Sequence, residues 1–168
     1  IKEYFGDGRQ WGVSIRYLEE KEPMGTAGAL GLLPEKPNES LLVMNGDVIT
    51  SLDFDSLLRF HQDQGGVATI CVRKHITQIP YGVLQLDQSH VQSLDEKPSV
   101  THYVNTGMYV LEPNVLEFLP STKSRVDMPN LIEKVIANKH LVNAFPVHEY
   151  WLDVGRPEAL EQANGDWS

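Results

Sequence analysis

The chain has 168 residues, 41% of them hydrophobic and 22% charged, which is the composition of an ordinary globular domain. Its 23 acidic and 14 basic side chains give a formal net charge of -9, so nucleic acid and anionic membrane surfaces are disfavoured as partners. The single cysteine, Cys71, excludes a disulfide framework, and no apolar run approaches the ~20 residues of a membrane span. We expect a cytoplasmic protein that binds neither nucleic acid nor membrane.

The first residues have the pattern of a helix end, because Ile1–Phe5 is followed at once by Gly6. With no initiating Met, we expect this chain to be part of a longer one. Apolar and polar residues alternate over Val13–Leu18, which predicts a half-buried strand. Met24–Gly28 then leads into small residues at Ala29–Leu33, which predict the start of a helix.

The segment Ser40–Asp47 changes abruptly from an apolar run to Asn45-Gly46-Asp47. This pattern predicts a buried parallel strand that delivers the Asp47 carboxylate to the carboxyl edge of a sheet, where open α/β sheets bind ligands. A carboxylate there suits a magnesium ion held against phosphate oxygens. The alternative is an ordinary turn in which Asp47 caps the next helix.

A βαβ alternation follows. Helical spacing predicts a helix over 53–62 with Asp53 as its cap, and Val67–Val72 is a β-rich run. We interpret His61 as a packing residue of the helix and Cys71 as a small core residue. The alternation predicts a doubly wound, mixed but mainly parallel sheet in the α/β class.

The second half is richer in short strands. The expected elements are a hairpin of Gly82–Leu86 and His90–Leu94, a strand Tyr103–Leu111 containing Asn105-Thr106-Gly107, a helix introduced by Asp127-Met128-Pro129, a strand Leu141–Phe145, a second acid-glycine break at Tyr150–Gly155, and a helix from Pro157 to about Ala163.

Five motifs occur in a fixed order along the chain. They are Pro23-Met24-Gly25-Thr26-Ala27-Gly28, Asn45-Gly46-Asp47, Pro80-Tyr81-Gly82-Val83, Glu96-Lys97-Pro98 with Asn105-Thr106-Gly107, and Trp151-Leu152-Asp153-Val154-Gly155. The series resembles the sugar-1-phosphate nucleotidyltransferases, which are NDP-sugar pyrophosphorylases. Asp127-Met128-Pro129-Asn130-Leu131 and His148-Glu149-Tyr150-Trp151 are most similar to its guanylyltransferase-like branch, which acts on mannose-, heptose- or glucosamine-1-phosphate.

The resemblance implies a Rossmann-like fold, with the nucleotide-binding half at about 1–75 and the sugar-phosphate-binding half at about 76–168. It implies attack by a sugar-1-phosphate oxygen on the α-phosphorus of an NTP, with GTP favoured and diphosphate leaving. Catalysis of such a step is mostly positioning and charge neutralisation. The implied roles are Mg²⁺ binding by Asp47 and Asp153, sugar-phosphate binding by Lys97, sugar binding by Gly82, Glu96, Asn105 and Gly107, and nucleoside binding by Gly25, Thr26 and Gly28.

Each role has a structural alternative. Asp153 could be a turn acid before Gly155, and Glu96 with Lys97 could be a solvated pair ahead of Pro98. Gly82 and Gly107 could simply relieve strand sterics, and Gly25–Gly28 could be a helix start without a ligand.

One family feature has no match. The family grips the triphosphate with a glycine-rich loop after its first strand, with an Arg and a Lys nearby, and the double glycine Gly65-Gly66 here precedes a strand instead. We therefore expect an N-terminally truncated domain with negligible activity alone. An unpaired sheet edge would then invite a homo-oligomer or a missing N-terminal segment.

Two other function classes remain open. A metal-dependent glycosyltransferase usually presents Asp-x-Asp, for which Asp53-Phe54-Asp55 is the candidate, although it opens an amphipathic helix. A non-catalytic regulatory module could bind a nucleotide or sugar phosphate without the triphosphate loop. The residues do not determine which base or sugar is used.

Overall fold

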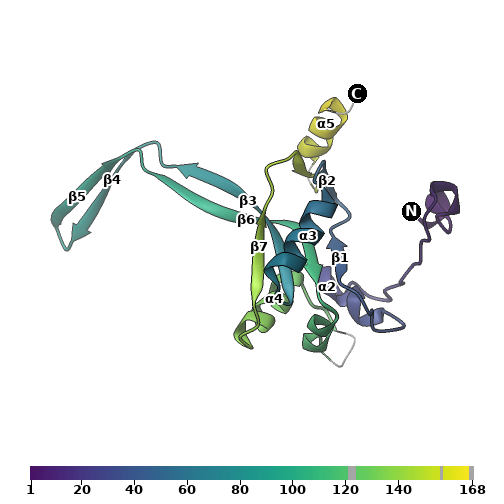
Figure 1. The fold of residues 1–168 in the computed structure, drawn as a ribbon. Helices are drawn as coiled ribbons and strands as arrows, with labels where there is room; N and C mark the ends of the chain where they lie inside the picture. Colours follow the sequence, from purple (N-terminus) through teal and green to yellow (C-terminus); the bar gives the residue numbers. More distant parts are fainter. Residues whose placement is uncertain (121–123, 156, 167–168) are drawn as a thin grey trace. The chain divides into compact units, whose positions relative to one another are not determined.

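A computed structural model describes residues 1–120, 124–155 and 157–166 (Figure 1). The chain forms two compact units, one of Ile1–Leu41 with Glu112–Leu141 and one of Leu42–Leu111 with Val142–Ser168. In chain order the elements, with η for 3₁₀ helices, are α1 Lys2–Phe5, η1 Arg9–Trp11, α2 Gly25–Gly28, η2 Ala29–Leu32, β1 Leu41–Met44, β2 Val48–Thr50, α3 Phe54–Gln64, β3 Ala68–Gln78, β4 Gly82–Asp87, β5 His90–Glu96, β6 Ser99–Leu111, η3 Pro113–Phe118, α4 Met128–Ala137, β7 Val142–Pro146, β8 Trp151–Asp153 and α5 Pro157–Asp166.

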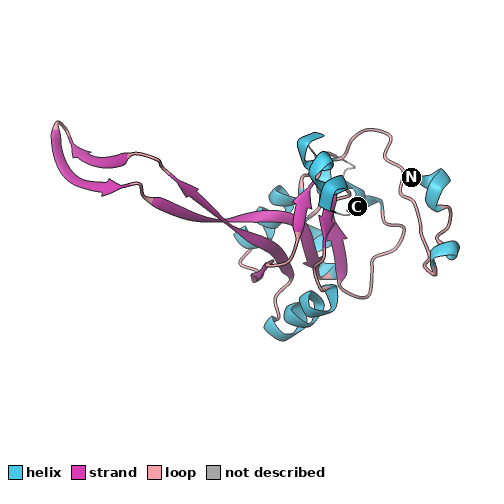
Figure 2. Ribbon diagram, turned by 90° about the horizontal axis from the view of Figure 1, so that it is seen from above, coloured by secondary structure: helices cyan, strands magenta, loops and turns pink. Residues whose placement is uncertain are grey.

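The second unit is built on a four-stranded sheet with the order β1-β6-β3-β7. β3 pairs antiparallel with β6 over almost its whole length and parallel with β7. Two further antiparallel pairs, β2 with β8 and β4 with β5, complete the strands (Figure 2). β6 therefore lies between β1 and β3 and contacts both.

Helix α3 covers the sheet with its apolar side. Its N-cap is Asp53, whose side chain accepts a hydrogen bond from the Asp55 N–H. Leu57 is fully buried in the core of this unit. That core consists of Val48, Leu52, Leu57, Cys71, Met108, Val110 and Val147, with Phe54, Leu58, Phe145 and Trp151 partly buried against it.

The buried polar groups at this interface are paired, as burial requires. His61, on α3, is 2% exposed, and its Nδ1 lies 2.7 Å from the Thr69 hydroxyl of β3. His61 thus has a structural partner, which agrees with its interpretation as a packing residue.

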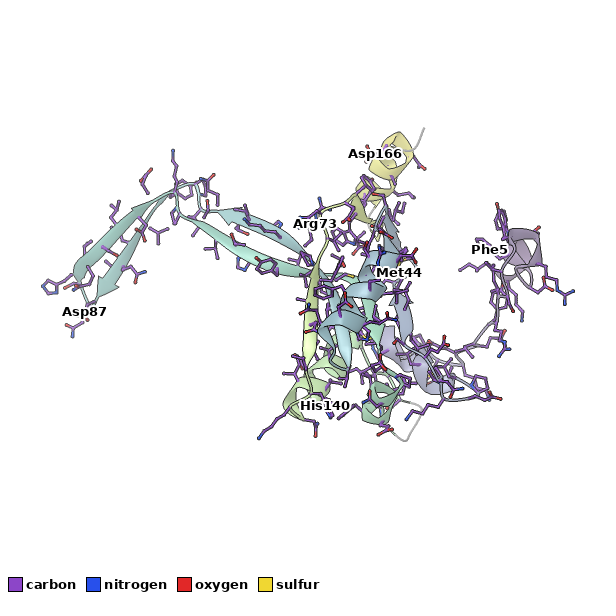
Figure 3. All side chains as sticks on the ribbon, in the orientation of Figure 1. Phe5, Met44, Arg73, Asp87, His140 and Asp166 are labelled. Carbon is purple, nitrogen blue, oxygen red and sulfur yellow. The ribbon has the colours of Figure 1, made fainter. Side chains whose placement is uncertain are left out.

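The hairpin β4–β5 has one apolar and one polar face. Leu84 pairs with Leu94 and Leu86 with Val91, while Asp87 pairs with His90 beside the turn (Figure 3). The four apolar side chains remain between 48% and 61% exposed. The predicted hairpin is confirmed, with β5 reaching as far as Glu96.

The first unit packs α2, η3 and α4 around its own core. Pro129 lies in the first turn of α4, where its missing N–H has no partner to lose. The helix buries Met128, Leu131, Ile132 and Val135. Its C-terminal end precedes His140, whose ring contacts Phe118 edge to face at 5.3 Å (Figure 3).

The expected mainly parallel sheet is wrong, because most of the described strand pairs are antiparallel. The reason is topological: β6, from later in the chain, inserts between β1 and β3, whose apparent βαβ unit suggested direct neighbours. β1 was expected to be buried, yet Leu42 and Met44 are 42% and 45% exposed. β1 is the first strand in the sheet order and, within the part of the chain that the structure describes, it has a neighbouring strand on one side only.

The expected strand at Val13–Leu18 is also wrong, because this segment is irregular. The Ile15 N–H bonds the carbonyl of Asp7 in a local loop instead of a neighbouring strand. Val13 and Leu18 stay largely exposed, so the alternation does not correspond to a buried face.

Among the described residues, no helix combines the length and apolar character that crossing a membrane requires.

Candidate active site

The site begins with a bulge in β6. Ile70 of β3 pairs with Tyr109, but Val72, two residues on, pairs with Asn105. The three residues of β6 between these pairs, Thr106–Met108, therefore oppose Cys71 alone and form a bulge with two extra residues. The Thr106 hydroxyl donates to the Cys71 carbonyl oxygen at 2.9 Å in the buried interior, which fixes the bulge to β3.

The segment that carries the first acid, Asp47, is hydrogen-bonded to this bulge. The Asn45 N–H donates to the Gly107 carbonyl oxygen at 2.9 Å. Gly107 has φ +77°, and a Cβ there would lie 2.7 Å from Asn45 Nδ2. Only glycine fits this close approach in the left-handed region. The turn Asn45-Gly46-Asp47 thus begins at a residue that is hydrogen-bonded to the bulge.

The segment that carries the second acid, Asp153, is hydrogen-bonded to the same bulge. The Trp151 indole N–H donates to the Thr106 carbonyl oxygen at 2.9 Å, which ties β8 to β6. In the β2–β8 pair, Val48 is opposite Asp153. The Val154 N–H also donates to the Asp47 carbonyl oxygen at 2.8 Å. Two acids from opposite halves of the sequence therefore lie side by side, Asp47 in the turn before β2 and Asp153 at the end of β8.

The space between the two carboxylates lies at Gly155. A Cβ on Gly155 would be 3.0 Å from Asp153 Oδ1 and 3.4 Å from Asp47 Oδ2. The missing side chain leaves room bordered by both carboxylates, and both acids are exposed to solvent. Within the described residues no group of three His, Cys, Asp or Glu side chains could hold a metal. Two carboxylates beside open solvent fit Mg²⁺, which takes one or two protein oxygens and keeps several waters.

Asn105, which directly precedes the bulge, is exposed, and its amide bonds to neighbouring residues of β6. Nδ2 donates to the Tyr109 hydroxyl at 2.6 Å, and Oδ1 accepts the Gly107 N–H at 3.0 Å. Burial raises the pKa of Tyr109, which keeps this phenol protonated as a partner for the amide. An amide nitrogen carries two hydrogens, so one donor remains for a ligand.

Gly82, Glu96 and Lys97 form a separate group at the base of the hairpin. Gly82 pairs with Glu96, and a Cβ on Gly82 would lie 3.0 Å from Glu96 Oε2. Lys97 has φ +49°, and its carbonyl oxygen accepts a hydrogen bond from Gln78 Nε2 at 3.4 Å. At about 3.3 Å per residue, the six residues from Ser99 to Asn105 put this group on the order of 20 Å along β6 from the bulge.

The turn at Gly25–Gly28, in the other unit, is locked by reciprocal caps. The Thr26 hydroxyl accepts the Met128 N–H at 2.7 Å, and Asp127 Oδ1 accepts the Thr26 N–H at 3.3 Å. Gly25 has φ +79°, and a Cβ there would lie 2.5 Å from Asp127 Oδ1. The Thr26 hydroxyl and N–H are thus used to join α2 to α4.

The residues missed by the sequence analysis are those that attach the acids. Trp151 entered the sequence analysis only as part of a motif, and it provides the indole bond to β6. Arg73, on β3 (Figure 3), was outside the predicted strand, and its Nη1 donates to the Glu149 carbonyl oxygen at 3.0 Å. Two features of the sequence could have indicated these residues. Arg73 is a cation directly after a predicted strand, and Trp151 is two residues before an acid. Asp53, the first acid of the Asp-x-Asp candidate, is occupied as the α3 cap.

Comparison with known proteins identifies the family of the chain. The profile of the nucleotidyl transferase family matches residues 1–168. The chain belongs to this family. It is 36% identical over 160 residues to a mannose-1-phosphate guanyltransferase of Debaryomyces hansenii, covering 89% of this chain and 43% of the relative. It is 33% identical over 169 residues to mannose-1-phosphate guanyltransferase beta-B of Xenopus laevis, covering 94% and 45%.

Among solved structures, HddC from Yersinia pseudotuberculosis in complex with GMP-PN has the same fold, with a TM-score of 0.65, 22% identity, and coverage of 99% of this chain and 74% of that one. The resemblance to sugar-1-phosphate nucleotidyltransferases of the guanylyltransferase-like branch is therefore confirmed. This nucleotidyl transferase chain spans less than half the length of the curated relatives it matches.

Proposed function

We propose that the protein carrying this chain transfers a nucleotidyl group from an NTP, with GTP favoured, to a sugar-1-phosphate and releases diphosphate. The observation that carries the proposal is the meeting of Asp47 and Asp153 around Gly155. Further support comes from the relatives, which are mannose-1-phosphate guanyltransferases, and from HddC, whose crystal contains GMP-PN.

In this proposal Asp47 and Asp153 would hold Mg²⁺. The ion would neutralise charge that develops on the phosphate oxygens and orient both substrates. The chain contributes position: Val154 N–H fixes the Asp47 backbone, and Gly155 N–H donates to Asp153 Oδ1 at 3.0 Å. The second oxygen of Asp153 is then oriented by the bond that its partner oxygen makes.

The sugar end is proposed for Asn105, Gly107, Gly82, Glu96 and Lys97. Asn105 retains one amide hydrogen for a hydroxyl, and Gly107 lets backbone approach closely. Lys97 is proposed to neutralise the sugar phosphate and Glu96 to accept sugar hydroxyls. Glu96 and Lys97 lie at the hairpin base. For them to contact the same substrate as the two acids, the end of β6 that adjoins the hairpin must approach the acids when substrate binds.

The nucleoside end is proposed for the Gly25–Gly28 turn. Its small residues allow a planar base to approach the backbone closely. The Thr26 hydroxyl already accepts the Met128 N–H, so its own hydrogen is the group left to donate to a base. This assignment places nucleoside binding within about residues 1–75, the half of the chain proposed to bind the nucleotide.

The test is a screen of NTPs against sugar-1-phosphates, with diphosphate release as the readout, on the protein that carries this chain. Asp47→Asn and Asp153→Asn should each lower kcat/KM by about 100-fold or more, because each removes a charge that acts on the transition state. Asp87→Asn, at the exposed hairpin turn, is the matched control and should retain full activity. Full activity in both acid variants would remove the metal assignment.

The second candidate is a regulatory module that binds a nucleotide or a sugar phosphate without turnover. Calorimetry with GTP and with mannose-1-phosphate separates the two. Binding of either ligand without turnover for any substrate pair would support the module and contradict the transferase.

A further inference from the structure

The two acid-bearing segments are attached to β6 in the same way. The carbonyl oxygen of Thr106 accepts a hydrogen bond from the Trp151 side chain, and that of Gly107 accepts one from the Asn45 backbone. In each segment the donor lies two residues before the acid. Two consecutive bulge carbonyls therefore set the positions of both carboxylates.

These two attachments differ in what can replace them. The Asn45 bond uses a backbone N–H, and any residue other than proline would supply it. The Trp151 bond uses the indole N–H, which no other natural side chain offers with the same ring shape. Trp151 is half-buried against the core, so an orphaned Thr106 carbonyl there would be poorly compensated by water.

β8 is a short strand held mainly by β2. It is three residues long and, among the described strands, pairs with the three residues of β2, through Val48 to Asp153, Ile49 to Leu152 and Thr50 to Trp151. Backbone bonds from Val154 to Asp47 and from Ser51 to Tyr150 extend this pairing at its two ends. A two-stranded pair of this length is not stable alone in water. Asp153 is exposed at its end. The bond from Trp151 to Thr106 is thus the direct hydrogen bond from β8 itself to β6, next to the bond from Asn45 to Gly107 that holds the other side of the ribbon.

We propose that Trp151 is a positioning residue for the acid pair: its indole N–H, bonded to the Thr106 carbonyl, holds β8 so that Asp153 faces Asp47 across Gly155. This role rests on the metal site of the proposed function. Trp151 touches neither substrate nor ion; it acts through the bulge that also carries the Asp47 turn.

The experiment titrates Mn²⁺ alone into the ¹⁵N-labelled protein that carries this chain and follows paramagnetic broadening of the amide signals of Asp47, Val154 and Gly155. Trp151→Phe keeps an aromatic ring and removes the N–H. We expect it to need about 10-fold more Mn²⁺ for half-broadening, the lower end of losses seen when a group supporting a metal ligand is removed. Trp11→Phe makes the same change at an exposed site and should stay within about twofold of wild type.

Two further variants separate positioning from stability. Leu57→Val loosens the same core without touching the bond, and should lower Tm while leaving the Mn²⁺ midpoint unchanged. Trp151→benzothienylalanine replaces the N–H by sulfur at constant ring shape, so it should weaken Mn²⁺ binding even if the Phe variant folds poorly.

Different outcomes would overturn the positioning role of Trp151 and the metal site of Asp47 and Asp153. Wild-type Mn²⁺ affinity in Trp151→Phe and Trp151→benzothienylalanine, or an equal loss in Leu57→Val, overturns the positioning role and leaves the acid pair intact. If Mn²⁺ broadens the amide of Asp87, at the exposed hairpin turn, before those of Val154 and Gly155 in the wild-type chain, the metal site of the proposed function fails, and the positioning role fails with it.

Discussion

The carbonyl oxygen of Asp47 accepts a 2.8 Å hydrogen bond from the N–H of Val154, the residue that follows Asp153. This contact joins the two acidic motifs through their backbones, so it does not depend on the protonation state of either carboxyl group. It leaves both side chains available to a ligand at the same place, beside Gly155.

Gly155→Ala should impair metal-dependent function with little loss of stability. The new Cβ would lie 3.0 Å from Asp153 Oδ1 and 3.4 Å from Asp47 Oδ2, so it fills the space between the carboxylates. The backbone of Gly155 is outside the left-handed region, so alanine adds no conformational strain. We expect Mn²⁺ affinity to fall about 10-fold and Tm to change little. Gly46→Ala, where a Cβ meets nothing within 4 Å, is the control. Unchanged affinity in Gly155→Ala would show that the ion does not occupy this space.

Gly107→Ala should destabilise the second unit by about 2 kcal/mol or more, because alanine is strained in the left-handed region. A further cost comes from the contact of 2.7 Å between the new Cβ and Asn45 Nδ2. Chemical denaturation of Gly107→Ala, Asn45→Ala and the double variant forms a cycle that separates the two costs. Additive effects would mean that the Asn45 contact contributes nothing.

Thr26→Val should destabilise the first unit by about 1 kcal/mol, because it removes the hydroxyl that accepts the Met128 N–H at the start of α4. Thr26→Ser keeps the hydroxyl and should retain most of the stability. The measurement is the free energy of unfolding from urea titration. Equal stability of the Val and Ser variants would contradict the capping role.

Stability should fall with rising pH above about 9, and Cys71 should be responsible for the first part of the fall. Burial, with a smaller effect of the Glu149 carboxylate, raises the pKa of the Cys71 thiol from 9.0 to about 12. The unfolded thiol therefore loses its proton first, and each pH unit between 9 and 12 favours unfolding by at most about 1.4 kcal/mol.

The check is the free energy of unfolding between pH 8 and 10 for wild type and Cys71→Ala. The wild-type slope should be the steeper above pH 9, whereas the variant should be nearly flat until tyrosines titrate. Burial also raises the pKa of Tyr109 above 10.0, so its contribution begins later and is common to both proteins. Identical slopes below pH 10 would contradict the assignment.

The sequence was informative wherever the signal is local. Asp53 before an amphipathic run predicted α3, and Pro129 after Asp127 predicted α4, because caps and first-turn residues act within one helical turn. The hairpin was predictable from the polar turn beginning at Asp87. These elements need no knowledge of what packs against them.

The sequence was uninformative wherever position depends on a distant partner. The place of β6 between β1 and β3 arises from long-range pairing that periodicity does not encode. Val13–Leu18 alternates like a strand but lacks a strand to pair with among the described residues. The bulge was partly readable, since a glycine inside a strand pattern such as Gly107 indicates one. The position of Lys97 at the hairpin base was not readable from its motif.

The two extra residues of β6 opposite Cys71 have a consequence for insertions and deletions. An even number of added residues restores the in-out alternation on both sides, so Met108 and Val110 still point to the interior. Deleting one residue here would turn the rest of the strand inside out, whereas deleting two would leave a regular ladder. The bulge to which both acidic segments are bonded could therefore be lost from β6 without changing which face of the strand is turned to the core.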